Sequence, residues 1–417
     1  MKKNFIFKMI LIISIVLVSA CENDPVENHD PEKPVAVVGN NQTTLVGSYF
    51  ILDARESQKN SGDTLFYTWT ENPTNPESVF LFGDPFYYKA VNIPGEYKYT
   101  LTVNNGIKDS EPVELIINVL PRETSEISDP VLEAKIRFML NKQVGTLTNQ
   151  DYLAIDSLRI TIGSNPGNIK PLENLVGIDK CANLYYLNLS LQSVSDIEPI
   201  HNLTKLEVLY LDQNRRINDI SPLSNLINLR YLDISVNPIT NISPLANLRN
   251  LEVLDIIGND VDDISVVRNF PKLKEFWASR LPIQNLDDFS NAVDLEVLFF
   301  MFSEIKDISA LANCRKLIQI EISGNEISDI SSLENLTDLL TLRITENKIE
   351  DIAPIKNLTK VSSLWLNDNL IQDIKPLVEN TGLGNYCEVT LFNNPLNEIS
   401  VNEYIPQLIS RGVLVYY

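Results

Sequence analysis

Histidine and cysteine are scarce in this chain of 417 residues. The two histidines, His29 and His201, stand far apart in the sequence, and there are only four cysteines. The chain shows no nucleophile–base–acid arrangement, no phosphate-binding loop and no spacing typical of metal ligands. We therefore expect no enzymatic activity, no cofactor and no bound metal.

Positive charge is also limited, because 34 lysines and arginines stand against 55 aspartates and glutamates. The formal net charge of −21 makes nucleic acid a very poor partner, since phosphate backbones bind to basic surfaces. A strongly charged surface keeps a protein soluble, which is the simplest explanation of the acidic excess.

The only long hydrophobic run lies at the N-terminus. It extends from Met9 to Val18, follows several lysines and precedes small residues, and it is too short to cross a bilayer. Residues 1–20 are therefore predicted to be a secretory signal peptide. The sequence Val-Ser-Ala-Cys that ends at Cys21 resembles the lipobox of bacterial lipoproteins. This resemblance implies cleavage before Cys21 and lipidation of that residue; an ordinary signal peptide with a chance cysteine is the alternative.

Residues 21–33 contain mostly acidic residues and prolines with a single aliphatic side chain, so they are predicted to be an extended tether. Acidic residues directly after a lipidated cysteine resemble the export signal of bacterial surface lipoproteins. The resemblance implies an outer-membrane lipoprotein exposed at the cell surface, anchored by lipid alone. A lipoprotein that faces the periplasm remains the alternative.

Residues 34–120 contain short runs of alternating apolar and polar residues separated by turn signals such as Pro94-Gly95 and Asn104-Asn105-Gly106. This spacing predicts a small antiparallel β-sandwich. The series Leu52-Asp-Ala-Arg-Glu-Ser57, then Tyr67-x-Trp69 and Gly95-x-Tyr97, resembles the immunoglobulin-like PKD domain. The resemblance implies a spacer or weak binding module in which Trp69 is buried on a central strand.

Residues 158–378 repeat with a period of 22. Asparagines 225, 247, 269, 291, 313, 335 and 357 begin successive repeats that contain the pattern L-x-x-L-x-L-x-x-N. This period and pattern are typical of leucine-rich repeats, which stack into a solenoid with a parallel β-sheet because one unit cannot bury its own apolar side. In each repeat the two leucines that are spaced two residues apart are predicted to point into the core.

Two polar positions recur in these repeats. The asparagine that ends each strand is predicted to bind backbone groups of neighbouring turns, because buried backbone polar groups need partners. An aspartate that precedes each helical return is predicted to be a bend residue rather than a metal ligand. The asparagines are Asn214, Asn237, Asn259, Asn325, Asn347, Asn369 and Asn394, and the aspartates are Asp219, Asp307, Asp329, Asp351 and Asp373.

Both ends of the solenoid are expected to be capped. In residues 121–157, a linker leads to a helix that opens at Asp129-Pro130, with Leu132, Ile136, Met139 and Leu140 on its apolar face. In residues 379–417, a last strand at Val389 is followed by a capping helix over 402–411. The N-terminal cap and the 22-residue repeats with D-I-S-P-L resemble internalins. That resemblance covers about 290 residues and implies the fold without naming a ligand.

The cysteines of the solenoid are expected to stay unpaired. Cys181 and Cys314 occupy a leucine position of their repeats and should be core thiols, and six turns separate them. At about 4.8 Å per strand these residues are about 29 Å apart, whereas a disulfide requires Cα atoms within about 7 Å. Cys387 lies three further turns away and is also too distant.

Function is expected on the concave face of the sheet, where the side chains between the inward leucines point to solvent. Aromatic residues rimmed by polar groups are typical of interfaces, although they could also simply brace the sheet. The repeats that contain Leu281 and Ser303 lack the asparagine, and such departures are often found at functional sites. The predicted ligand-binding residues are Tyr210, Tyr231, Asp233, Asp255, Trp277, Phe299, Met301, Phe302 and Trp365.

The sequence therefore predicts a lipid-anchored cell-surface protein that binds a protein partner through the concave face of its repeats, without catalysis. The alternative is a glycan-binding lipoprotein, because sugars stack on tryptophan and tyrosine and donate hydroxyl hydrogens to carboxylates. We expect a monomer.

Overall fold

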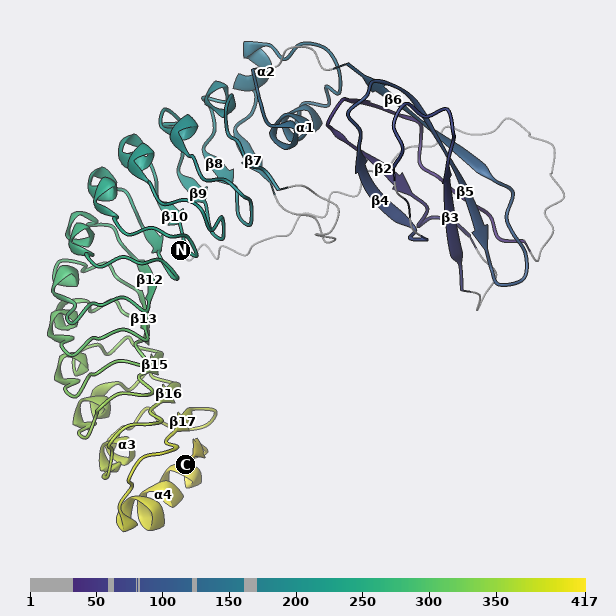
Figure 1. Cartoon of the computed structure of the whole chain (residues 1–417). Helices are drawn as coiled ribbons and strands as arrows, with labels where there is room; N and C mark the ends of the chain where they lie inside the picture. Colours follow the sequence, from purple (N-terminus) through teal and green to yellow (C-terminus); the bar gives the residue numbers. More distant parts are fainter. Residues whose placement is uncertain (1–32, 59–63, 80, 82, 122–125, 161–170) are drawn as a thin grey trace, which may run out of the picture.

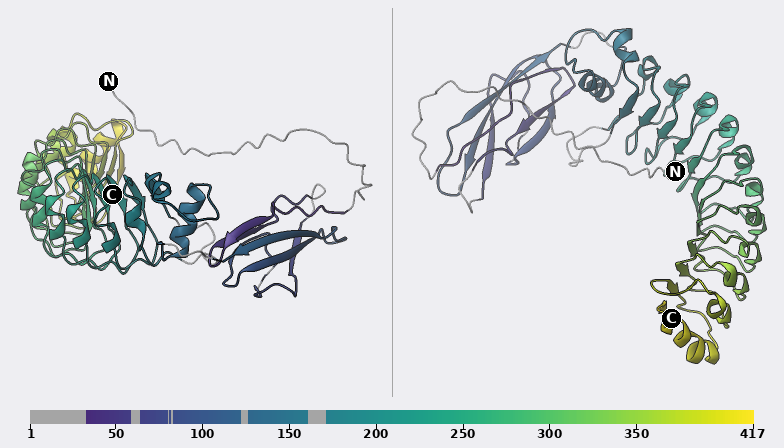
Figure 2. Two further views of the ribbon diagram at one scale, coloured as in Figure 1. Left: turned by 90° about the horizontal axis from the view of Figure 1, so that it is seen from above. Right: turned by 180° about the vertical axis from the view of Figure 1, so that it is seen from behind.

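The computed structural model describes residues 33–58, 64–79, 81, 83–121, 126–160 and 171–417. Figures 1 and 2 show a β-sandwich followed by a curved solenoid, whose strands line the inner side of the curve. The predicted signal peptide, Cys21 and all of the predicted tether except Lys33 lie outside the described residues. Within the described residues, no helix combines the length and apolar character that a membrane crossing requires.

The N-terminal sandwich packs a four-stranded sheet against a two-stranded one. The four strands follow the order β1-β6-β5-β3, and β2 pairs with β4 in the other sheet. Tyr97, Tyr99 and Leu101 alternate with partly exposed residues along β5 and fill the core. The strands are β1 Gln42–Leu45, β2 Tyr49–Asp53, β3 Phe66–Glu71, β4 Phe86–Ala90, β5 Gly95–Asn104 and β6 Val113–Leu120.

Two details of the predicted sandwich are wrong. The sandwich is not wholly antiparallel, because β1 pairs with β6 in parallel. Trp69 is buried as predicted, with 6% of its surface exposed, but its strand β3 lies at the edge of the four-stranded sheet. Its burial comes from the opposing sheet, since Trp69 belongs to one apolar cluster with Phe50, Leu52 and Tyr87 of β2 and β4.

Two helices, α1 (Pro130–Met139) and α2 (Asn149–Leu153), cap the first repeat. Asp129 caps α1 through the Val131 N–H at 2.8 Å, and its second carboxylate oxygen accepts the N–H groups of Glu173 and Asn174 in the first repeat. Leu132 and Ile136 are fully buried as predicted, which covers the open end of the core. The prediction for Met139 is wrong, because this residue is 39% exposed at the end of the helix.

The solenoid contains a twelve-stranded sheet in which every strand is parallel to its neighbours, as expected for leucine-rich repeats. Each turn adds one strand, so successive repeats are adjacent in the sheet. The strands are β7 Ser157–Arg159, β8 Tyr186–Asn188, β9 Val208–Tyr210, β10 Tyr231–Asp233, β11 Val253–Asp255, β12 Glu275–Ser279, β13 Val297–Met301, β14 Gln319–Glu321, β15 Thr341–Arg343, β16 Ser363–Trp365, β17 Glu388–Thr390 and β18 Leu414–Tyr416.

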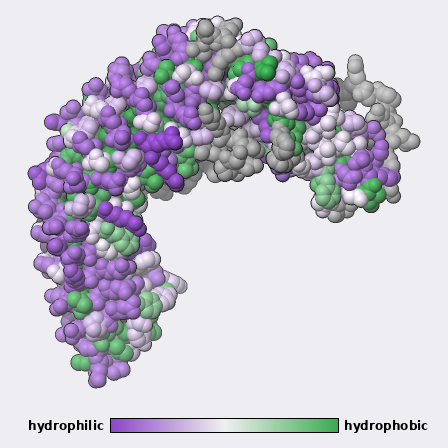
Figure 3. Space-filling view, in the orientation of Figure 1, coloured by the Kyte–Doolittle hydropathy of each residue, from purple (hydrophilic) through white to green (hydrophobic). Residues whose placement is uncertain are grey.

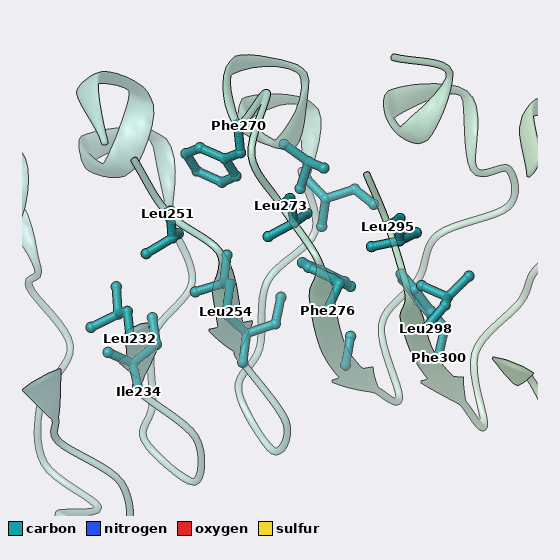
Figure 4. Close-up of a cluster of buried hydrophobic side chains, with 14 of the residues drawn as sticks. Leu232, Ile234, Leu251, Leu254, Phe270, Leu273, Phe276, Leu295, Leu298 and Phe300 are labelled. Carbon is teal, nitrogen blue, oxygen red and sulfur yellow. The ribbon is translucent and has the colours of Figure 1, made fainter. Parts of the chain in front are cut away.

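Short helical segments form the outer side of the curve, and the leucine columns lie between them and the sheet (Figure 4). Leu232, Leu254 and Phe276 are fully buried at equivalent positions of three successive repeats. The 3₁₀ segments are η2 Ile178–Lys180, η3 Glu198–Ile200, η4 Ser221–Asn225, η5 Ser243–Asn247, η6 Ser265–Asn269, η7 Asp287–Phe289, η8 Ser309–Asn313, η9 Ser331–Leu333 and η10 Ala353–Asn357, and the next return is α3, Lys375–Glu379.

The predicted roles of the recurrent asparagine and aspartate are confirmed. Asn347 donates to the carbonyls of Ile322 and Ile344 at 3.1 and 3.2 Å and accepts the Ile327 N–H at 3.0 Å, so it links two turns. The aspartates accept the backbone N–H two residues later, as Asp219 does with Ser221 at 2.8 Å, and therefore shape the bend into each return.

The C-terminal cap contains one strand more than predicted. A π-helical turn (η11, Ser400–Tyr404) and α4 (Ile405–Ser410) form the expected helix, and then β18 pairs in parallel with β17. The strand at Val389 is therefore not the last one. The three cysteines of the solenoid, Cys181, Cys314 and Cys387, are buried and unpaired, and burial raises the pKa of Cys181 to about 12.

Candidate functional site

The strand register places one outward-facing residue of each repeat in a single line, which we call the central column. Figure 3, which views the solenoid from the side, shows a largely hydrophilic surface with apolar side chains in small groups. Along the sheet the central column contains Arg159, Asn188, Tyr210, Asp233, Asp255, Trp277, Phe299, Glu321, Arg343, Trp365, Thr390 and Tyr416.

Trp277 and Phe299 form a face-to-face stack in the middle of this column. They are register partners on β12 and β13, their ring centroids are 3.9 Å apart and their planes differ by 17°. The Trp277 Nε1–H donates to Glu275 at 3.3 Å, which fixes the edge of the indole. Both rings point outward as predicted, and they are only partly exposed because each covers one face of the other.

The other predicted aromatic residues do not continue this stack. Tyr231 lies in the column next to the central one, and its ring centroid is 4.6 Å from that of Tyr210. Tyr186 extends the pair, with its centroid 6.0 Å from Tyr210. The predicted aromatic series is therefore divided into a tyrosine cluster, the Trp277–Phe299 stack and a separate Trp365.

Two carboxyl groups lie between the tyrosine cluster and the stack. Asp233 and Asp255 are direct neighbours on β10 and β11, and Asp255 is also the register partner of Trp277. Burial first, and then the charge of Asp233, raise the pKa of Asp255 to about 7. The pKa of Asp233 is also raised, mainly by burial, although two hydrogen bonds from Ser235 oppose the increase.

No basic side chain of the described chain contributes to the pKa of either carboxyl group. A third carboxyl group, that of Asp212, lies two residues beyond Tyr210, the register partner of Asp233, and accepts a hydrogen bond from the hydroxyl of Ser190. Near neutral pH, Asp255 therefore changes charge beside a stacked tryptophan. A cationic group brought by a ligand would favour the charged form of both carboxyl groups.

The two repeats that lack the asparagine have longer strands. β12 and β13 each contain five residues, and their pairing continues to Ser279 and Met301, whereas the neighbouring strands contain three. Ser303 replaces the missing amide only in part, since its hydroxyl accepts the Leu281 N–H at 3.1 Å. The Trp277–Phe299 stack thus lies on the most extensively paired part of the sheet.

Phe302 and Met301 lie at the edge of this extended segment. Phe302 is 50% exposed and has a left-handed backbone conformation, with φ of 51°. Its ring lies against Gly324, where an added Cβ would come within 2.3 Å of the ring. Met301 is partly exposed and pairs with Ser279. Both residues follow Phe299 closely in the sequence, and their role in binding stays a prediction.

Arg343 is the side chain near Trp365 that our sequence analysis did not select. Its guanidinium carbon is 4.2 Å from the centroid of the Trp365 ring. The sequence could have pointed to Arg343 through its position, because it is the only basic residue of the central column between Asn188 and Thr390. Histidine, cysteine, aspartate and glutamate form no group of three or more that could hold a metal in the part of the chain that the structure describes.

A family model for leucine-rich repeats, spanning two copies, matches residues 227–269. The solved structure of an internalin (InlF) from Listeria monocytogenes shares 29% sequence identity with this chain and superposes with a TM-score of 0.59, covering 70% of this chain and 91% of that one. The repeat region therefore has a leucine-rich repeat fold that is similar to the fold of an internalin.

Two other internalins of the same organism are less similar. Internalin C2 shares 23% identity with a TM-score of 0.40 and covers 65% of this chain and 95% of its own. The functional domain of InlJ shares 18% identity with a TM-score of 0.45 and covers 68% of this chain and 78% of its own. No match to the chain was found among curated protein sequences.

Proposed function

We propose that this internalin-like protein binds a protein partner through the concave face of its solenoid, without catalysis. The observation that carries the proposal is the Trp277–Phe299 stack beside Asp255, a carboxyl group with a raised pKa and no basic neighbour. Stacked aromatic residues on a rigid sheet lose little conformational entropy on binding, and such residues dominate the energy of protein interfaces. The partner would contribute an apolar side chain to the stack and a cationic one to Asp233 and Asp255.

Glycan binding is the second candidate, and the geometry favours it less. A sugar ring stacks on an open aromatic face, but Trp277 and Phe299 each use one face on the other. Probing protein arrays and glycan arrays in parallel with the full chain separates the two functions. Selective retention of acidic or neutral sugars, with no protein captured, would replace our proposal with the second candidate.

The double variant Trp277→Ala with Phe299→Ala tests the location of the site. We expect capture of an array-identified partner to fall at least about 30-fold, because truncation of interface anchors typically costs about 2 kcal/mol or more. The free energy of unfolding should fall by only about 1 kcal/mol, since the inward residues Phe276 and Leu298 are untouched. Surface plasmon resonance and urea denaturation measure the two effects.

Phe138→Ala is the matched control for this variant. Phe138 is 70% exposed on the capping helix α1, outside the concave sheet, so its removal should change neither binding nor stability noticeably. Full binding by the double variant would place the site elsewhere. A large loss of stability would instead show that the stack mainly braces the sheet.

We also propose that the chain is a lipoprotein anchored through Cys21, exposed at the cell surface, with residues 34–120 as a PKD-like spacer. The proposal rests on the signal-like residues 1–20 and the sequence before Cys21. Cys21→Ala should move the protein from the membrane fraction to the soluble fraction, because one or more acyl chains would be its only anchor. An unchanged distribution of the variant between fractions would refute lipid anchoring, and protease treatment of whole cells tests surface exposure.

A further inference from the structure

A second group of side chains lies on the concave face and begins on β14, one strand beyond the stack. Glu321, Arg343, Trp365 and Thr390 are successive residues of the central column on β14 to β17. Arg343 lies over the Trp365 ring at 4.2 Å. The nearest approach of Glu321 to the guanidinium is 3.7 Å, which is an ion pair but is too long for a hydrogen bond.

Four polar atoms, three in this group and one in Thr345 just after β15, are buried and have no hydrogen-bond partner within the described chain. They are Arg343 Nε, Trp365 Nε1, Thr345 Oγ1 and Thr390 Oγ1. Thr390 as a whole is only 7% exposed. Buried polar atoms in proteins are nearly always paired, so four unpaired atoms on three adjacent strands require an explanation.

The type of these atoms indicates what is missing. The nitrogens of Arg343 and Trp365 can only donate hydrogen bonds, and the threonine hydroxyls can donate as well. The group therefore lacks hydrogen-bond acceptors. A carboxylate supplies two acceptor oxygens in the geometry that a guanidinium group binds best.

Access to the group runs through Arg343. Its side chain is 32% exposed, whereas Glu321 is 8% exposed on one side and Thr390 is buried on the other. A ligand thus meets the guanidinium first. A carboxylate that pairs with the guanidinium would draw it away from the Trp365 ring and give the atoms behind it access to an acceptor.

We propose that Arg343, Trp365 and Thr390 form a subsite for a carboxylate of an acidic segment in the protein partner. The inference rests on the proposed function, because the partner must already lie on the concave face. Phe299 and Arg343 are two strands apart, or about 10 Å, so a single segment can reach both the stack and this subsite. Elsewhere the central column is acidic or uncharged between Asn188 and Thr390, so a carboxylate has one place to bind.

Nuclear magnetic resonance of the tryptophan indoles tests this subsite without the partner. The chain contains three tryptophans, Trp69, Trp277 and Trp365, so three indole N–H signals report on three different places. The probe is a peptide of four glutamates blocked at both ends. We expect the peptide to shift the Trp365 signal in a saturable manner and to leave the Trp69 signal unchanged.

Variants and a neutral peptide test whether the shift comes from a carboxylate bound at Arg343. Arg343→Gln should weaken peptide binding about tenfold or more, as expected for loss of a charge-assisted pair, while the melting temperature stays close to that of the parent protein. Arg159→Gln is the matched control, because Arg159 lies in the same column on β7 and should not affect the Trp365 signal. A peptide of four glutamines should produce no shift.

Three results would overturn the subsite: no saturable shift, an equal shift with the glutamine peptide, or a shift that survives Arg343→Gln. A shift with tetragalacturonate but not with the glutamate peptide would assign the subsite to an acidic glycan and overturn the acidic protein segment. The peptide experiment does not depend on whether the Trp277–Phe299 stack binds the partner. If the peptide shifts Trp365 but Trp277→Ala with Phe299→Ala leaves partner capture intact, the proposed anchor fails and the carboxylate subsite stands.

Discussion

The repeats on either side of the Trp277–Phe299 stack are built differently from the two repeats that carry it. In the repeat of β15, Asn347 binds backbone groups of two turns and the strand has only three residues. In the repeats of β12 and β13, Leu281 and Ser303 occupy the position of this asparagine, and the strands pair over five residues. The longer pairing accompanies the missing amides, while Asn325 of the next repeat still binds the Phe300 carbonyl and the Ile305 N–H.

This difference shows how a repeat protein changes its surface without changing its core. The inward residues Phe276 and Leu298 are as completely buried as the leucines of the regular repeats. What differs is the length of the paired segment beneath the outward side chains. Longer pairing holds Trp277 and Phe299 in register, which suits a surface that must present two rings at a fixed spacing.

Removing the amide from a regular repeat is expected to have the largest effect on stability. Asn347→Ala leaves three carbonyls and one N–H without their side-chain partner, and should lower the free energy of unfolding by about 3 kcal/mol. Ser303→Ala removes a single accepted bond to Leu281 and should lower it by about 1 kcal/mol. Equal losses in urea denaturation would mean that the amide does not distinguish the two regions.

A methyl group at Gly324 should have a smaller effect that is centred on the stack. Gly324→Ala places a side chain at φ of 68° and brings its Cβ within 2.3 Å of the Phe302 ring, so we expect a loss of about 1–2 kcal/mol and a displaced Phe302. Gly258→Ala is the matched control, because its φ is also 68° but the nearest atoms of Val236 are 3.5 Å away. Both variants should melt earlier, and only Gly324→Ala should weaken partner binding.

A dependence of stability on pH is expected at the boundary between the regions. The pKa of Asp255 is raised from 3.8 to about 7, so folding disfavours its charged form and stability should fall as the pH rises through this interval. Asp255→Asn should therefore raise the melting temperature at pH 8, and the gain should disappear toward pH 4.

Asp219→Asn should change the dependence of stability on pH in the opposite direction. The pKa of Asp219 is lowered by hydrogen bonds from Ser221, so this carboxylate stabilises the fold above its unfolded pKa and the benefit is lost as the pH falls. The variant should be less stable than the parent protein at pH 8. If both variants show the same pH dependence in thermal melts, the burial of Asp255 does not control its ionisation.

Much of the binding face could be predicted, because a 22-residue period places residues 22 apart in neighbouring strands. Trp277 and Phe299 were assigned to one column on this basis, and the strand register confirms it. The cluster of Arg343 with Trp365 was missed, since nothing in the period shows that a guanidinium lies on an indole or that the atoms around it are unpaired. β18 was missed because its residues belong to no repeat.

The sequence by itself determined the order of the columns, the inward leucines and the asparagine and aspartate positions, because each of these follows from spacing along the chain. Only the tertiary structure decided how far each outward side chain is exposed. Phe299 covers Trp277, and packing of neighbouring turns buries Asp255 enough to raise its pKa. Exposure and pKa depend on distances between atoms of different turns, and a repeat period specifies which residues are neighbours but not how closely their side chains pack.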